Sequence, residues 1–235
     1  FGFHRDRAAF DINNDGFSDM TSINNTTFGA RLYHRVASRG KITMDYFNIN
    51  EFRRGGDGFD LPPHEALIAE VVRHHINSGA INFDLLAREN DQFTVFFSAQ
   101  KVKRETYYGA NQDPSAYGFT NDFTYTVGGQ YARDVGMILF APLKVTLGAE
   151  HNGSKLKDTK QGYYDRQLDV HFGNTEVARQ QLNTSAAFFQ NEWTFTKGSF
   201  AAGVRYDHYV VADKLNLSSD VIGDVVSPRI NLLYN

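Results

Sequence analysis

A run of oxygen-bearing residues near the start of the chain has the spacing of a calcium-binding loop. Gly16 stands where such a loop turns sharply, and the candidate ligands alternate around it: Asp11, Asn13, Asp15, Phe17 (through its backbone carbonyl) and Asp19. Ser22 occupies the position where a helix-loop-helix calcium loop carries a bidentate Glu. Coordination would therefore be incomplete or completed by another loop, and an Asx-rich turn with solvated carboxylates is the alternative.

Aromatic and cationic residues recur in and beside the segments that lack a strand pattern. They are Arg53, Arg54, His64, Tyr107, Tyr108, Tyr117, Tyr163, Tyr164, Arg166 and His171. Aromatic faces with cationic partners suit flat, anionic or metal-chelate ligands. The alternative is that these aromatics pack the loops against each other. The neighbours His74 and His75 could each bind a metal, but adjacent strand residues face opposite sides, so both cannot bind one ion.

The sequence contains none of the common catalytic motifs. It has no Gly-x-Ser-x-Gly, no His-Glu-x-x-His and no phosphate-cradling glycine loop, so we predict that the protein is not an enzyme. A formal net charge of -3 gives no basic footprint for nucleic acid. Cysteine is absent, which excludes disulfides and thiolate metal sites.

A period-two alternation of apolar and polar residues runs along almost the whole chain. Leu143, Val145 and Leu147, for example, alternate with Lys144 and Thr146. The pattern predicts about nine strands, at 26–37, 41–54, 75–87, 92–106, 121–133, 143–157, 182–196, 199–212 and 228–235. The polar face could line a water-filled lumen or be the solvated outside of a soluble sheet.

The connections between these strands alternate strictly between short and long. Those near 37–41, 88–91, 134–142 and 196–198 are mostly short, and those near 55–74, 105–121, 158–181 and 213–227 are long. Transmembrane barrels sort their connections in this way, with brief periplasmic turns and extended extracellular loops. We therefore predict an all-β antiparallel transmembrane barrel segment.

The predicted strand number indicates a section of a larger barrel. Nine is odd, whereas bacterial single-chain barrels have even numbers of strands, and the first and last strands would leave backbone groups unpaired in lipid. The chain also begins in a predicted loop and stops within a strand. We expect residues 1–235 to be part of a barrel domain whose other strands lie outside this chain.

Several segments resemble the TonB-dependent outer-membrane receptors of the Bacteroidetes type. They include Asp11–Asp19, Asn24–Arg31, Asn50–Gly56, Tyr107–Ala110, Gly148–Asn152, Lys155–Asp158, Phe189–Trp193 and Ser227–Asn231. The likeness is greatest to the vitamin B12 and ferric-siderophore receptor branch. It implies a barrel of about 22 strands in the bacterial outer membrane, with its lumen closed by a plug domain. It also implies energy coupling through a TonB complex that binds a box ahead of the plug.

The resemblance leads to one functional expectation and two alternatives. We expect a receptor that takes up a scarce bulky nutrient (cobalamin, haem or an iron-siderophore), with a surface lipoprotein as a candidate cap over the loops. A passive porin or an adhesin barrel is the first alternative. A soluble β-sandwich carbohydrate-binding module is the second, and it would bury Phe28, Val127, Leu147 and Val204 together between two layers.

Overall fold

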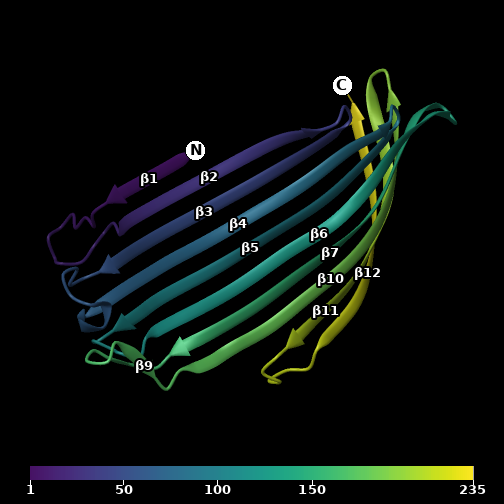
Figure 1. Cartoon of the computed structure of the whole chain (residues 1–235). Coiled ribbons are helices and arrows are strands. Elements are labelled where there is room, and N and C mark those ends of the chain that lie inside the picture. The colour runs from purple at the N-terminus through teal and green to yellow at the C-terminus, as the bar shows by residue number, and fades with distance from the viewer. Residues whose placement is uncertain (235) are drawn as a thin grey trace.

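The computed structural model describes residues 1–234, and its main feature is one ten-stranded antiparallel sheet (Figure 1). Each strand pairs with the next sheet strand along the chain. The order is β1 (Gly2–Arg7), β2 (Ser22–Val36), β3 (Gly40–Gly56), β4 (Ile68–Arg88), β5 (Asp91–Ala110), β6 (Tyr117–Ile138), β7 (Ala141–Gln161), β10 (Thr175–Phe195), β11 (Gly198–Asp213) and β12 (Val221–Tyr234). Two short strands, β8 (Tyr163–Asp165) and β9 (Val170–Phe172), form a separate hairpin, and η1 (Pro63–Glu65) is a single 3-10 turn.

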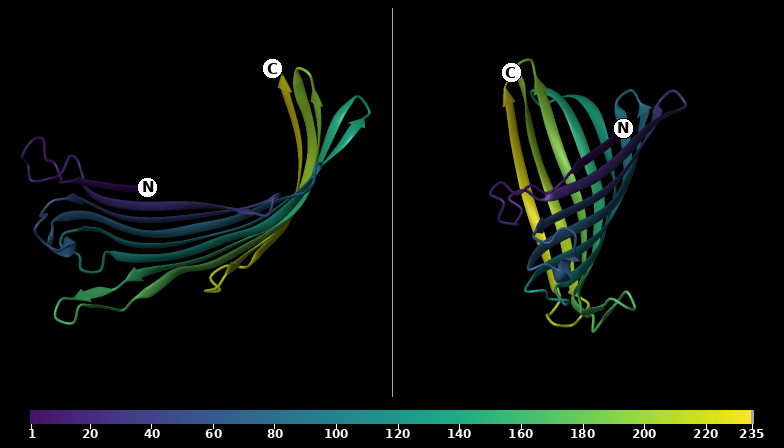
Figure 2. Two further views of the ribbon diagram at one scale, coloured as in Figure 1. Left: turned by 45° about the horizontal axis from the view of Figure 1, so that its top comes forward. Right: turned by 90° about the vertical axis from the view of Figure 1, so that its left-hand side faces the viewer.

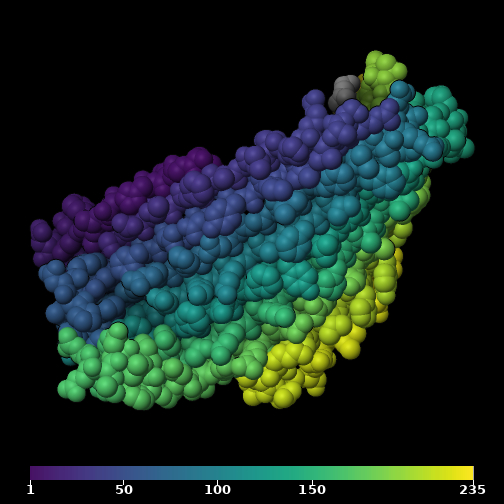
Figure 3. Space-filling view, viewed as in Figure 1, coloured from purple at the N-terminus to yellow at the C-terminus, as the bar shows by residue number. Residues whose placement is uncertain are grey.

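The sheet curves into an open trough, with β1 and β12 as its two edges (Figure 2). Figure 3 shows the strands as a continuous packed surface between the purple and yellow edges. Among the described residues each edge strand pairs on one side only. Unpaired backbone groups are costly in lipid, so this geometry suits part of a larger closed barrel.

The predicted all-β barrel segment is confirmed, but the strand number and strand ends differ from the prediction. β1 and the β8–β9 hairpin lie in segments predicted to be loop, and most sheet strands extend further toward the long loops than predicted. The alternation patterns fade there because the two faces of the strand no longer differ in polarity. At the other end, β6 and β7 meet at a two-residue turn, Leu139 and Phe140, with Leu139 at a φ of 63°. This explains the apolar sequence around that turn: its residues belong to strand ends.

Short and long connections separate to opposite ends of the sheet, as predicted. The short turns are 37–39, 89–90, 139–140 and 196–197, and the longer connections are 57–67, 111–116, 162–174 and 214–220. Figure 1 places the β2–β3, β4–β5, β6–β7 and β10–β11 turns together at the upper right. We refer to the two ends as the short-turn end and the long-loop end.

The two faces of the sheet differ in polarity. Residues paired across strands share a face, so the register places Phe28, Val127, Leu147 and Val204 on the same, convex face. Their side chains are 52%, 42%, 47% and 45% exposed. A two-layer β-sandwich would bury them, so that alternative is wrong.

The concave face is polar, with aromatic rings laid over glycines of the neighbouring strand. Phe96 lies opposite Gly128, and a Cβ at Gly128 would stand 2.5 Å from the Phe96 ring. Phe188 lies opposite Gly148, where the corresponding distance is 2.4 Å. Each ring covers backbone that the glycine leaves bare, which pins the strand register. Phe96 and Phe188 therefore lie on the concave face as part of regularly paired strands.

Buried apolar side chains gather at one place only within the described residues. Ala66, Ala69 and Tyr107 form a small core beside the long loops, with Val71 and Tyr117 packed against it. None of the helical residues in the described range forms a segment long and apolar enough to cross a bilayer.

Candidate functional site

Three connections meet over the convex face at the long-loop end, and we call this assembly the loop cluster. It comprises residues 57–67, 111–116 and 162–174 with the strand ends beneath them. Tyr107 is its centre, because its side chain is only 1% exposed and its hydroxyl donates a hydrogen bond to the Asp113 carbonyl at 2.9 Å. Packing and hydrogen bonding here follow the pattern of a soluble protein core.

Aromatic and imidazole rings join these connections. The Tyr117 ring contacts the Tyr107 ring edge-on at 4.7 Å between centroids, and the His171 ring at 4.9 Å. Tyr164 lies 5.2 Å from His64 and 5.0 Å from His171. The Tyr117 hydroxyl and His64 Nδ1 are 2.8 Å apart and share a hydrogen bond. Each of the three connections therefore contributes to, or packs on, one continuous cluster of rings in edge-on and tilted contact.

Charged side chains complete the loop cluster. The Arg54 guanidinium donates hydrogen bonds to the Leu61 and Gly58 carbonyls, both at 2.7 Å, and lies over the Phe59 ring. Arg166 forms an ion pair with Glu65, which links the β8–β9 hairpin to η1. These contacts hold the loops together, so much of the predicted ligand set is engaged in structure.

A hollow of about 930 Å³ remains between the loop cluster and the convex face. His64 lines it, and the buried Nε2 of that ring has no hydrogen-bond partner among the described residues. Burial lowers the pKa of His64 below its ordinary value, partly opposed by the carboxylate of Glu65. A hydrogen bond from the Tyr164 hydroxyl to Asp169 raises the pKa of Tyr164. The hollow thus offers one unsatisfied ring nitrogen within an aromatic wall.

A second cavity opens at the same height on the concave face, and we call it the inner pocket. It measures about 340 Å³ and is lined by Glu51, Arg53, His74, Arg104 and Tyr108, among others. Glu51 accepts hydrogen bonds from Arg53 and Asn25, and its carboxylate lies 3.7 Å from the His74 ring. Among the described residues, the Arg104 guanidinium donates only to the Thr120 hydroxyl, at 3.2 Å. Its charge is therefore free to meet an anionic ligand.

Strand alternation divides the predicted ligand residues between these two cavities. Arg53 and Tyr108 line the inner pocket, whereas Tyr107 belongs to the loop cluster on the other side of the sheet. Arg54 borders both cavities, but its guanidinium binds within the loop cluster. His64, Tyr117, Tyr164 and Arg166 also lie in the loop cluster. Tyr163, which alternates with Tyr164 in β8, is 57% exposed. The predicted set therefore does not converge on one ligand.

Arg104 and Glu70 also line the inner pocket and are not among the ligand residues predicted from the sequence. Both lie on strands at positions that share the inward face of Arg53. Counting alternation outward from Arg53, strand by strand, would have found them. That count requires the pairing register between β3, β4 and β5. A single sequence did not provide this register, because the predicted strands ended before the residues at the long-loop end.

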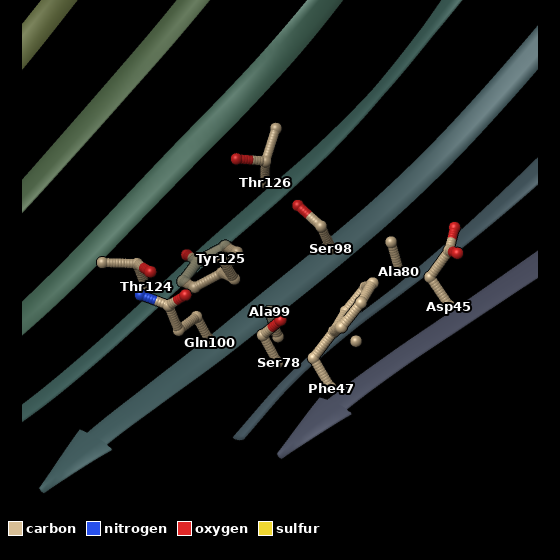
Figure 4. A pocket seen from close by; sticks show the side chains of 11 residues that line it. Asp45, Phe47, Ser78, Ala80, Ser98, Ala99, Gln100, Thr124, Tyr125 and Thr126 are labelled. Atoms are coloured by element: carbon tan, nitrogen blue, oxygen red, sulfur yellow. The ribbon is translucent and has the colours of Figure 1, made fainter. Parts of the chain in front are cut away.

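Further down the concave face, hydroxyl and amide side chains of neighbouring strands lie side by side (Figure 4). Ser78 on β4 is opposite Gln100 on β5, and Gln100 is opposite Thr124 on β6. With Asp45 and Thr126 they line a hollow of about 300 Å³. Such a surface suits water or another polar surface, because these five side chains can each donate or accept a hydrogen bond.

The predicted calcium residues form a compact turn between β1 and β2. Both carboxylate oxygens of Asp11 accept backbone hydrogen bonds, from Asn14 at 2.7 Å and Gly16 at 2.8 Å. Asp15 accepts from Phe17, and Asp19 from Ile12. Within residues 1–234, no three His, Cys, Asp or Glu side chains stand in a metal-binding arrangement. Calcium binding stays a prediction, and it would require the Asp11 oxygens to exchange backbone donors for the cation.

The fold and its two-faced sheet define a class of protein, the outer-membrane barrels. The family model "TonB dependent receptor-like, beta-barrel" matches residues 3–235, and the chain belongs to this family. The family consists of bacterial outer-membrane receptors and transporters.

Solved structures of the same architecture cover nearly all of the chain. The ferric preacinetobactin receptor BauA from Acinetobacter baumannii has a TM-score of 0.71 and 12% identity, over 98% of this chain and 39% of its own. The unliganded ferric citrate transporter FecA has a TM-score of 0.59 and 11% identity, over 94% and 34%. For the copper transporter OprC the values are 0.58 and 14%, over 97% and 36%. A comparison with curated protein sequences gave no match.

These likenesses establish the fold alone, because all the identities are low. The chain spans less than two fifths of the length of the structures that it resembles.

Proposed function

We propose that this chain is a section of the barrel wall of an energy-coupled outer-membrane receptor that takes up a scarce, bulky nutrient. The observation that carries the proposal is the single curved sheet, apolar outside and polar inside, in a chain that belongs to the TonB-dependent receptor family. In this proposal the other strands, the plug domain and the segment that binds the TonB complex lie in the rest of the receptor.

The long-loop end faces the outside of the cell in this proposal, because outer-membrane barrels have brief periplasmic turns and longer extracellular loops. The strands support this orientation, since β4 to β7 and β10 extend well past their apolar band toward the long loops. A nutrient arriving from outside would then reach the inner pocket before the plug. A surface lipoprotein that closes over the loops is a further part of the proposal.

The nutrient that we propose is an anionic metal chelate of the ferric-siderophore type. Arg53, Arg104 and Tyr108 in the inner pocket provide two guanidinium groups and a phenol ring for such a ligand. The names of the solved structures support a metal-bearing cargo, since two proteins are named for ferric complexes and one for copper. Haem and cobalamin remain members of the same proposal, as does a place in the Bacteroidetes vitamin B12 and siderophore branch.

Uptake by cells that express the full-length receptor tests the energy coupling. Cells lacking other receptors for the chelate would be given a radiolabelled ferric siderophore, with and without a functional TonB complex. We expect uptake to stop without TonB while surface binding persists. Uptake that continues at an unchanged rate would identify a passive porin, and binding without any uptake would identify an adhesin.

Paired variants locate the ligand. In the full-length receptor, R53Q with R104Q alters the inner pocket, and H64Q with R166Q alters the outer hollow. We expect the first pair to weaken chelate binding by roughly ten- to a hundredfold, since hydrogen bonds to charged groups contribute about 1.5–3 kcal/mol. The second pair should leave affinity unchanged. The reverse result would move the ligand site to the loop cluster.

A further inference from the structure

The convex face of the sheet carries a cationic surface directly beyond its apolar band. On β5 the convex face changes from apolar to cationic between Ala99 and Lys101, which are successive residues on that face, and Lys103 follows. On β7 the outward residues include Lys155 and Lys157. The register puts Phe123 of β6 between Lys101 and Lys155, and Asn121 between Lys103 and Lys157. Four lysines of two strands thus flank one central strand of the sheet.

The charge of this surface contrasts with the rest of the chain. From β4 to β10, the convex face beyond the apolar band carries six cationic side chains and two acidic ones: Arg73, Lys101, Lys103, Lys155, Lys157 and Arg179 against Glu105 and Glu176. The concave face of the same strand segments carries two cations, Arg104 and Lys160, against Glu70, Asp122 and Asp158. The whole chain has a net charge of -3. Along these strand segments the positive excess is therefore confined to the convex face.

Among residues 1–234, three of these lysines have no anionic partner. The two acidic residues are occupied, since Glu105 pairs with Arg73, and Glu176 pairs with both Lys157 and Arg179. In the described part of the chain, Lys101, Lys103 and Lys155 form no ion pair, and all three are exposed. Like charges placed this close repel each other, so the arrangement is favourable only where an outside anion neutralises it.

We propose that this surface binds the phosphate groups of the outer-leaflet lipid that surrounds the receptor. The position favours a membrane-anchored phosphate over a free one, because the lysines begin where the lipid-facing band ends. Aromatic residues mark the same level, with Phe123 in the lysine rows and Tyr125 one step below. Long lysine stems can reach up or down to a headgroup while their methylenes lie on the sheet. The inference rests on the membrane orientation in the proposed function and on no particular nutrient.

Binding of a phosphorylated glycolipid to the full-length receptor in neutral detergent tests the proposal. The probe is diphosphorylated lipid A, and the comparison lipid is the same molecule with its phosphates removed. The variant K101Q/K103Q/K155Q should weaken lipid A binding on the order of 100-fold at low salt, since each lysine at an anionic surface contributes roughly fivefold. The weakening should shrink as salt is raised.

Two further variants control for folding and total charge. K144Q/K160Q/K197Q removes the same charge from the concave face and a short turn, and it should bind lipid A like the native receptor. K101R/K103R/K155R keeps the charge and should retain binding. Heat-modifiable gel mobility verifies that every variant is folded.

Three results would overturn the proposal. They are equal binding of the phosphate-free lipid, unchanged binding by K101Q/K103Q/K155Q, and full displacement of lipid A by millimolar inorganic phosphate, which would indicate a site for a free anion. TonB-dependent uptake is measured separately. A receptor that binds lipid A but does not transport would contradict the proposed function and leave this inference standing.

Discussion

The apolar band of the sheet and the loop cluster stabilise the chain by opposite arrangements of the same residue types. In the band, large apolar side chains such as Phe97 and Leu147 stay exposed on the protein surface, at 45% and 47%. Their burial is completed by lipid. In the loop cluster, Tyr107 and Ala66 are 1% and 2% exposed and are covered by protein alone. The chain thus has an apolar band on the outer face of its sheet and a small, protein-covered core among its loops.

Because one region is covered by lipid and the other by protein, substitutions in the two regions should have different effects. A change in the band alters the partition of the strand between water and lipid, so it should affect assembly of the whole barrel. A change in the loop cluster removes contacts between segments outside the membrane, so it should open the loops and leave the barrel intact.

The largest effect is expected for Tyr107→Ala in the full-length receptor. Removing a fully buried aromatic ring leaves a cavity and typically costs about 3–5 kcal/mol. Hydrogen exchange of residues 57–67 and 111–116 should accelerate strongly, while exchange of the membrane band stays slow. Tyr108→Ala is the matched control, because Tyr108 is the next residue in the chain, lies on the opposite face and is 57% exposed. Equal loss of protection in both variants, or loss in the band, would show that the loop cluster is not an independent unit.

The next effect concerns the band. Leu147→Arg puts a cation on the lipid-facing side, at a cost of roughly 2–4 kcal/mol near the bilayer midplane. The folded fraction in vesicles, measured by heat-modifiable gel mobility across a urea series, should fall. Thr146→Arg places the same charge one residue away on the polar face, where water or other polar groups can solvate it. If Thr146→Arg were the more damaging change, the assignment of the two faces would be wrong.

The fold could be predicted from the sequence because alternation and connection length are local signals. Residues 143–149 alone show the two faces, and the short and long connections show the two ends. The strand ends could not be predicted in the same way. On β4, for example, Val71 and Val72 lie on opposite faces, and both are apolar. Here strand pairing is set by backbone hydrogen bonds to neighbours and leaves no alternation in the sequence.

The candidate site was less predictable. Its residues were predicted from their chemical type, without regard to which face of the sheet each side chain lies on. The rule that separates His74 from His75 also separates Arg53 from Arg54 and Tyr107 from Tyr108. Applied to those pairs, it would have divided the predicted ligand residues into two groups. The folding of residues 57–67 and 162–174 over the convex face could not be inferred, since it depends on long-range contacts such as that between Arg166 and Glu65.

A smaller effect is expected from pH alone, which changes the charge of His64 without any substitution. It should alter the stability of the loop cluster and leave the apolar band unchanged. Burial lowers the pKa of His64 in the closed loop cluster, whereas an opened loop exposes the ring and restores its ordinary pKa near 6.5. Below that pH the open state takes up a proton more readily than the closed one. Closure is therefore fully favoured above about pH 6.5 and weakens as the pH falls toward the lowered pKa.

Hydrogen exchange of residues 57–67, measured between about pH 8 and pH 5 and corrected for the intrinsic rate, checks this. H64N should abolish the pH dependence, and H75N, at an exposed position on β4, should leave it intact. The ring of His171 and the charges of Glu65 and Arg166 also face His64, so H171N is a second control. A pH dependence that survives H64N and disappears in H171N would assign the titration to the other imidazole.

The smallest effect is expected in the turn between β1 and β2, which belongs to neither core. Asp11→Ala removes the acceptor for the Asn14 and Gly16 backbone donors, at a cost of about 1 kcal/mol, because both donors can turn to water. Exchange at those two amides should accelerate, and Asp6→Ala on β1 should have no such effect.

Added calcium provides a second test of the same turn. If the predicted site binds the cation, calcium should slow exchange across residues 11–19 in the native receptor and have no effect in Asp11→Ala. If both respond to calcium alike, the prediction is wrong, and the Asp11 carboxylate serves only to close the turn.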